Sequence, residues 1–242
     1  MSMLPSDVWL RVFPAPRISD VLAYVHATWD WLRATFATAV SFDHDETALT
    51  DNLCDALGDE DRRFAHRMDC DFQAETWEFR RGGDGQTTRV ARADIRVILG
   101  APGTPHLVLE FKKLDGSSNA RWRYCFDGMS RFVEGKYAVG HAFGVMCGFS
   151  PHDLAAEASK LAAYIGQHEY ARNLCCILNN LGEVVTKPSA IDPIWARFDT
   201  SHERPSVVPN DPIILLHALL PCPPSASPPA RIPKRKRRSS GP

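Results

Sequence analysis

Two acidic residues and a lysine have the types and spacing that metal-dependent chemistry requires. Asp94 is followed 16 positions later by Glu110, and Lys112 comes two positions after Glu110. Carboxylates are hard oxygen ligands for a divalent metal. A nearby ammonium neutralises phosphate charge or, where neighbouring cations lower its pKa, assists water deprotonation. The three residues predict a site for phosphodiester hydrolysis, and the structural alternative is a surface pattern of paired charges on an antiparallel sheet.

A β-hairpin is expected to position these residues. Apolar residues alternate with polar ones over Arg92–Leu99 and His106–Lys112, and the Gly- and Pro-rich residues Gly100–Pro105 separate the two runs. If paired residue numbers sum to about 204, Asp94 lies opposite Glu110 on one sheet face. Opposed carboxylates destabilise a sheet, and a bound cation would remove that penalty.

The preceding segments predict two helices and a further strand. Apolar spacing predicts a helix from an N-cap at Ser19, which packs on the core or, alternatively, offers a partner surface. Asp43–Leu57 predicts a second helix, and Glu46 lies in its first turn. Glu46 is either a site residue or a solvated acid favoured by the helix dipole. Phe72–Arg80 predicts a strand that begins a three-stranded meander ending at Lys112.

The following segments complete an α/β pattern. Arg121–Ala138 has aromatic residues at helical spacing and predicts a covering helix. His141–Phe149 is a continuous apolar run typical of a buried central strand, followed by a helix over Pro151–Gln167. The intervening helix allows that strand to lie parallel to the hairpin, so the sheet is predicted to be mixed. Later strand patterns are weaker, at Leu174–Leu178 (strand or helix) and Ile213–Leu216.

This arrangement resembles the PD-(D/E)XK nuclease superfamily, which has the restriction-endonuclease-like fold. Asp94, Glu110 and Lys112 match its motif, although Ala93 stands at the position of the proline. The core order of that family is helix, three-strand meander, helix and strand, and the same order is predicted for residues 43–149. The resemblance implies an α/β protein with a central mixed sheet flanked by helices.

The same resemblance implies a nuclease dependent on Mg²⁺ or Mn²⁺. Asp94 and Glu110 would be metal ligands, Glu46 an additional acidic ligand, and Lys112 the catalytic lysine. DNA is the expected substrate, in defence against foreign DNA or in repair, with RNA the less favoured alternative. Three cations near the motif are candidates for phosphate contacts: Lys113, Arg121 and Arg123. The alternative is that they form a solvated face.

A different class of function fits the same pattern. The chain would then be a catalytically silent, nuclease-like scaffold or interaction subunit of a larger complex. If it is an enzyme, its small size and acidic body suggest that a partner protein supplies target recognition, and many members of this fold act as homodimers. The chain has no G-x-x-x-x-G-K-[ST] loop, so an NTP-driven step would need another protein.

Charge is distributed unevenly along the 242 residues. Six of the 28 Lys and Arg residues follow residue 230 and no acid does, so residues 1–230 carry a net charge of −7. An acidic body binds DNA only through a local patch, its tail or a partner. We predict a helical extension (1–41), a nuclease-like domain (42–220) and a disordered Pro/Ser-rich basic tail (221–242). We expect the tail to act as a nucleic-acid tether. The alternatives are a targeting signal and a solubilising end.

Cysteine usage and hydropathy indicate a cytoplasmic protein. Seven cysteines without a C-x-x-C pair argue against a disulfide framework and a structural zinc site. Charged residues interrupt the apolar stretch Val21–Val40, so no membrane span is expected. Cys54, Cys125 and Cys147 are predicted to be buried. Two histidines are weaker candidates: His202, expected in a loop over residues 201–204, and His217, expected in the core.

Overall fold

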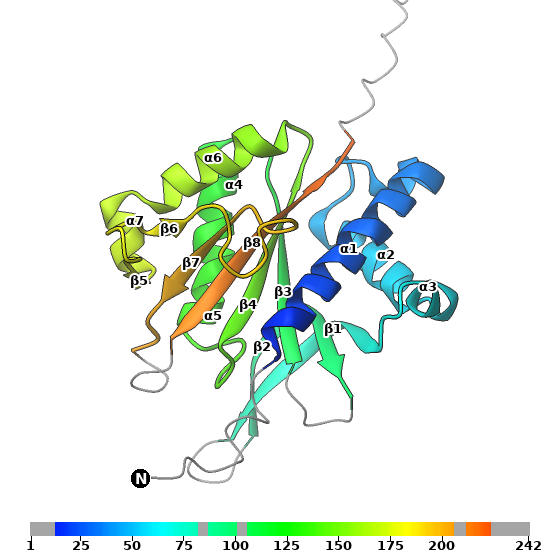
Figure 1. The fold of residues 1–242 in the computed structure, drawn as a ribbon, viewed down its shortest axis with the longest axis horizontal. Helices are drawn as coiled ribbons and strands as arrows, with labels where there is room; N and C mark the ends of the chain where they lie inside the picture. Colours follow the sequence, from blue (N-terminus) through cyan, green and yellow to red (C-terminus); the bar gives the residue numbers. More distant parts are fainter. Residues whose placement is uncertain (1–12, 82–86, 101–105, 206–211, 224–242) are drawn as a thin grey trace, which may run out of the picture.

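An eight-stranded mixed sheet lies between two groups of helices (Figure 1). The structure is a computed structural model and describes residues 13–81, 87–100, 106–205 and 212–223. The strand order is β1-β2-β3-β4-β8-β7-β5, and β6 also pairs with β7. The predicted α/β class and mixed sheet are confirmed. The strands are β1 (Cys70–Arg81), β2 (Thr87–Leu99), β3 (His106–Lys113), β4 (Phe143–Ser150), β5 (Cys176–Ile177), β6 (Val185–Thr186), β7 (Phe198–His202) and β8 (Ile213–Pro221).

The hairpin between β2 and β3 has the predicted register. The two strands are antiparallel, and their pairs run from Ile98 opposite His106 to Ile95 opposite Leu109, so paired numbers sum to 204. The predicted turn lies largely in residues 101–105, outside the described part of the chain. The regular β2–β3 pairs end at Ile95, the residue after Asp94, so Asp94 lies at the end of this ladder.

The middle of the sheet is parallel. β4 pairs in parallel with both β3 and β8, as the apolar run His141–Phe149 predicts for a central strand. Nearly every residue of β3, β4 and β8 is buried, because helices cover both faces. β8 extends beyond the predicted Ile213–Leu216, and β7 and β5 extend the sheet beyond it.

One face of the sheet is covered by the N-terminal helices. Trp29 of α1 packs 4.7 Å from the ring of Phe149, and its indole N–H donates to the carbonyl of Pro221 at 2.7 Å. α1 therefore packs on the core, and it begins at Ala15, after Pro14, rather than at Ser19. The elements of this layer are α1 (Ala15–Thr35), η2 (Ala37–Val40), α2 (Glu46–Gly58) and α3 (Glu60–Ala65).

The other face is covered by a helix with a π-helical middle. The predicted Arg121–Ala138 helix instead starts at Ser118 and ends at Val133. It passes close to the sheet at Gly128, where an added Cβ would lie 2.5 Å from Met146 Cε and 3.6 Å from Lys112 Cγ. The elements of this layer are α4 (Ser118–Arg123), η3 (Tyr124–Met129), α5 (Ser130–Val133), α6 (Leu154–Ile165) and α7 (His168–Asn173).

The cysteines, the C-terminal tail and the hydropathy of the helices can be compared with the sequence-based expectations. All seven cysteines are free, and Cys54, Cys125 and Cys147 are buried as predicted. The predicted basic tail lies outside the described residues from position 224 onward. Within the described ranges, no helix combines the length and apolar character needed to cross a bilayer.

The close packing of β4 against α5 and β8 predicts that Gly144 does not tolerate a side chain. A Cβ at Gly144 would lie 2.5 Å from Phe132 Cε1 and 3.0 Å from Leu215 Cδ2. We expect Gly144→Ala to lower the free energy of unfolding by about 1–3 kcal/mol, because the aromatic ring cannot move without disturbing the core. Urea unfolding measures this change. The matched control is Gly58→Ala at the end of α2, where a Cβ meets nothing within 4 Å. Equal effects of the two substitutions would contradict the packing described.

Candidate functional site

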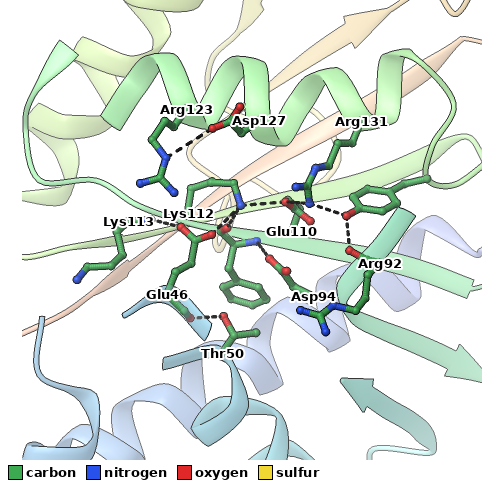
Figure 2. A network of polar contacts seen from close by, with 12 residues as sticks. Glu46, Thr50, Arg92, Asp94, Glu110, Lys112, Lys113, Arg123, Asp127 and Arg131 are labelled. Carbon is green, nitrogen blue, oxygen red and sulfur yellow. Dashed lines mark hydrogen bonds and ion pairs between the residues drawn. The ribbon is translucent and has the colours of Figure 1, made fainter. Parts of the chain in front are cut away.

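Four residues selected from the sequence meet in one polar network (Figure 2). Glu46 extends from the first turn of α2, Asp94 from β2, and Glu110 and Lys112 from β3. α2 begins at Glu46 because the Asp45 side chain caps it by accepting the N–H of Ala48. The alternation of β3 then directs Glu110 and Lys112 to the same side. Three separate segments therefore supply the site.

The Lys112 ammonium is at the centre of this network. It donates to Glu46 Oε1 at 2.8 Å, to Glu110 Oε1 at 2.9 Å and to the carbonyl oxygen of Phe111 at 2.7 Å. Lys112 is only 4 % exposed and Glu110 is fully buried. A buried ammonium needs opposite charge and filled hydrogen bonds, and three acceptors satisfy its three donors.

Backbone N–H groups of β3 orient the other carboxylate oxygens. Glu46 Oε2 accepts the N–H of Lys113 at 3.0 Å, and Asp94 Oδ2 accepts the N–H of Phe111 at 2.7 Å. The second bond forms where the regular β2–β3 pairs end, so the Asp94 carboxylate takes up a donor at the end of the ladder. The network thus fixes both acids to the strand that carries Glu110 and Lys112.

Arg131, from α5, is a member of the site that the sequence interpretation missed. Its Nη1 donates to Glu110 Oε1 at 2.9 Å and to the Tyr137 hydroxyl at 2.7 Å, and that hydroxyl donates to the Arg92 carbonyl. The available signal was one of three arginines in an aromatic helix, three residues after the glycine that lies close to the sheet. That pattern does not identify a contact with Glu110, because the contact depends on how the helix packs.

Burial and like charge raise the pKa of the acids. Burial raises the pKa of the Glu110 carboxyl to about 7, and the charge of Asp94 acts in the same direction. The positive charges of Lys112 and Arg131 oppose this shift without cancelling it. Burial also raises the pKa of Asp94, against the opposing charge of Lys112. The Asp94 charge thus acts on Glu110, as expected for acids on one sheet face.

Lys112 is held in its charged form. Burial alone would lower the pKa of the ammonium, but the charges of Glu110, Glu46 and Asp94 outweigh burial and raise it. The suggestion that a nearby cation and a bound metal lower the lysine pKa stays a prediction. Without a metal, the charged ammonium suits the other predicted role, in which it supplies positive charge beside a phosphate.

A pocket of about 530 Å³ opens beside Glu46. Two cations predicted to contact nucleic acid line it. Lys113 Nζ donates to the carbonyls of Phe42 and His44 at 2.6 Å each, whereas Arg123 is paired only loosely with Asp127, at 3.5 Å. The Arg123 side chain is 54 % exposed and is the better placed to meet a ligand. The lining residues are Phe42, Asp45, Glu46, Thr47, Lys113, Asp115, Asn119, Ala120 and Arg123.

Arg121 does not belong to this pocket. Its guanidinium is buried, donates to both carboxylate oxygens of Glu157 at 3.0 and 3.3 Å, and donates to the Gly116 carbonyl at 2.8 Å. Arg121 therefore ties α4 to α6, and the prediction that it contacts phosphate is corrected. The expectation failed because its acidic partner is 36 residues away in the sequence.

The two candidate histidines are buried in the core, on β7 and β8. His202 ends β7 rather than lying in a loop, and its imidazole contacts Thr200 Oγ1 at 2.7 Å and the Leu174 carbonyl at 2.8 Å. His217 contacts Thr200 Oγ1 at 2.9 Å and the Tyr124 hydroxyl at 3.0 Å, so its predicted core position is confirmed. Burial lowers the pKa of both imidazoles, that of His202 to about 4.

The acids suit a divalent metal in their chemistry. Glu46, Asp94 and Glu110 offer hard oxygen ligands, and Glu110 Oε2 is buried without a hydrogen-bond partner among the described residues. Among the described residues, no three Asp, Glu, His or Cys side chains lie close enough together to hold a metal ion in their present positions. The Lys112 ammonium instead lies between Glu46 and Glu110. Joint metal binding by the three acids would thus require these contacts to rearrange.

Comparisons with other proteins do not assign the chain to a family. No protein-family model, curated protein or solved structure matches it. The resemblance to the PD-(D/E)XK nucleases therefore rests on the site residues and on the order of the elements around them.

The raised pKa of Glu110 predicts a pH-dependent stability. Its carboxyl titrates near 4.5 in the unfolded chain and near 7 in the folded protein, so folding favours the protonated form. The resulting stabilisation is present below about pH 4.5 and is lost as the pH rises toward 7. Relative to Glu110→Gln, the wild type should therefore lose thermal stability across this window, measured by thermal unfolding in EDTA. The exposed Glu134→Gln serves as control, and a pH-independent difference for Glu110→Gln would contradict the assignment.

Proposed function

We propose that the chain is a metal-dependent nuclease of the restriction-endonuclease-like type that hydrolyses phosphodiester bonds in DNA. The observation that carries this proposal is the meeting of Glu46, Asp94 and Glu110 around Lys112, at the edge of a pocket. The four side chains come from α2 and from the two strands of the β2–β3 hairpin, and two of the acids are held by backbone N–H groups of one strand. A random surface pattern of paired charges would not bury a lysine and a glutamate together.

The acids would hold Mg²⁺ or Mn²⁺ through oxygen ligands. When bound, the ion would polarise the phosphate and lower the pKa of a coordinated water. Glu110 contributes an oxygen with no competing hydrogen bond among the described residues, and Asp94 retains the orientation set by Phe111. Arg131 restrains Glu110 from the opposite helix layer. These contacts thus orient the oxygens of Asp94 and Glu110, while metal binding by all three acids would still require the Lys112 contacts to rearrange.

Lys112 would act as a fixed positive charge. Its raised pKa keeps the ammonium charged near neutral pH, so it stabilises negative charge that develops on the phosphate oxygens in the transition state. The contact to Glu46 lies on the pocket side of the network, because Glu46 lines the pocket and Glu110 is fully buried. A phosphate that enters the pocket would meet Lys112 by displacing this contact.

Arg123 and Lys113 would position the nucleic acid. Both line the pocket, and contacts of this kind to phosphate oxygens set the register of a nucleic acid without reading its sequence. The remaining walls include Asp45 and Asp115, so the pocket is not a uniformly basic surface. With a net charge of −7 over residues 1–230, stable binding to a long duplex would need a partner protein or the basic tail.

A non-catalytic scaffold is the second candidate. The observation that favours it is the closed network, in which the ammonium of Lys112 already has three protein acceptors. Such a cluster can serve structure alone by holding α2 against β3. Metal-dependent cleavage distinguishes the two functions.

Cleavage assays test the catalytic proposal. We expect wild-type protein to nick supercoiled plasmid with Mg²⁺ or Mn²⁺ and not with EDTA. Glu110→Gln and Lys112→Met preserve side-chain volume, and each should reduce the rate by about 100-fold or more, because each removes charge from the reacting centre. Lys160→Met and Glu169→Gln on the exposed faces of α6 and α7 are matched controls. Matched single-stranded DNA and RNA substrates would test the preference for DNA.

Two results would contradict the proposal. One is cleavage at the wild-type rate by the Lys112→Met variant, or by the wild type in EDTA. Either result would indicate a contaminant or another site. The other is absence of cleavage from folded protein with every substrate and metal, tested alone and with any protein that co-purifies with it. Circular dichroism spectra of the variants establish that any loss does not reflect unfolding.

A further inference from the structure

A second, larger pocket lies on the side of α2 facing α1 and β1. Its volume is about 770 Å³, and we refer to it as the acidic-aromatic groove. Its lining combines aromatic and small apolar side chains with three carboxylates and includes no lysine or arginine. The lining residues are Trp31, Leu32, Phe36, Ala39, Asp51, Asn52, Cys54, Asp55, Ala56, Gly58, Asp59, Phe72 and Ala74.

Two aromatic rings in this groove are exposed. Trp31 is 36 % exposed and Phe36 is 49 % exposed, and their rings meet edge to face at 5.4 Å. Arg62 places its guanidinium carbon 4.1 Å from the Trp31 ring centroid, so this indole already accepts a cation. Exposed aromatic surface rimmed by polar groups is characteristic of an interaction site.

The carboxylates of the groove favour a basic occupant. Asp51 and Asp55 are four residues apart on α2, so their charges lie on one helix face and repel each other. Both are exposed, and neither forms an ion pair with any residue that the structure describes. A cation above α2 would relieve this repulsion, and apolar groups beside that cation would cover the two aromatic rings.

The C-terminal segment Arg231–Arg238 has this complementary chemistry. It carries six Lys and Arg side chains and no acid, and Ile232 and Pro233 lie among them. Guanidinium groups stack on aromatic faces as well as pairing with carboxylates. The segment thus matches both the charge and the apolar part of the groove.

The described chain ends next to this groove. The Pro223 carbonyl accepts the N–H of Phe42 at 3.0 Å, and the Cys222 thiol donates to the Val40 carbonyl at 3.0 Å. Ala39, the residue before Val40, lines the groove, and its carbonyl accepts the side-chain amide of Asn52 at 2.8 Å. Figure 1 shows the end of β8 beside the segment that joins α1 to α2.

The intervening chain is long enough to reach the groove. Arg231 follows Pro223 by eight residues, which span up to about 26–29 Å when extended. Phe42 is three positions after Ala39 in the sequence, so their Cα atoms are at most about 11 Å apart. The linker therefore allows binding within one molecule, where the effective concentration of a short tether is high.

We propose that residues 231–238 dock within the same chain in the acidic-aromatic groove. The aspartates pair with the basic side chains, while Trp31 and Phe36 contact Ile232 and the arginine planes. The body thereby holds its own basic segment on the face formed by α1 and α2. This inference does not depend on the catalytic proposal, because the groove shares no lining residue with the pocket beside Glu46.

Zero-length crosslinking of the full chain tests this docking. A carbodiimide joins a lysine directly to a carboxylate, and Lys234 and Lys236 are the lysines of the segment. We expect peptides from the monomer to join these lysines to Asp51, Asp55 or Asp59, as read by mass spectrometry. The crosslinks should be lost in about 1 M NaCl, where the Debye length is about 3 Å.

Two double variants test whether the tail binds this groove specifically, rather than any acidic surface. The double variant Asp51→Asn, Asp55→Asn removes two of the three groove acids and should abolish the tail crosslinks to the third, Asp59. The control double variant Asp153→Asn, Glu169→Gln changes exposed acids elsewhere and should leave all groove crosslinks unchanged. Trp31→Ser with Phe36→Ser keeps the acids and should still reduce crosslinking, because the apolar contacts are removed. Circular dichroism spectra verify that both groove variants are folded.

Three outcomes would overturn the proposal. One is tail crosslinks spread over exposed acids throughout the molecule, which indicates an unattached segment. Another is groove crosslinks found only in the dimer band, which identifies a second copy as the source of the basic segment. The third is absence of any tail crosslink at low salt, although the reagent labels the exposed acids.

Discussion

The burial of the Lys112 ammonium between Glu46 and Glu110 is the interaction on which the rest of this site depends. A charge removed from water is costly unless opposite charges and hydrogen-bond acceptors surround it. Here the acceptors come from α2 and from β3 itself, so the position of α2 on the sheet and the local network require each other. Loss of either acid would leave an imperfectly compensated buried charge, which is more damaging than loss of an exposed ion pair.

The sheet topology explains why this network forms at one end of the hairpin. β3 lies between an antiparallel neighbour and a parallel neighbour, and helices cover both faces of its central residues. Its pairing with β2 ends near Asp94, where a carboxylate accepts the N–H of Phe111. α2 lies over one face, and the helix with a π-helical middle supplies Arg131 from the other. Polar groups from both helix layers therefore meet where the β2–β3 ladder ends.

Local periodicity predicted the part of the site that lies within the hairpin. A strand period of two fixes which side chains share a face, so Asp94 and Glu110 could be placed together from sequence alone. Glu46 stayed ambiguous, because the rotation of its helix depends on the packing of α2 against the sheet. Arg131 was missed and Arg121 misassigned for a related reason: their carboxylate partners are 21 and 36 residues away. The two-residue strands β5 and β6 are too short to produce a periodic signal.

Direct measurement of metal binding tests the central claim most closely. Isothermal titration of wild-type protein with Mn²⁺ is predicted to show one site. Glu110→Gln should abolish binding, because it removes the buried carboxylate whose Oε2 has no protein partner among the described residues. Lys112→Met should retain or strengthen binding, because it removes a cation that competes for Glu46 and Glu110. Absence of Mn²⁺ binding to the wild type, or binding unchanged by Glu110→Gln, would contradict the account.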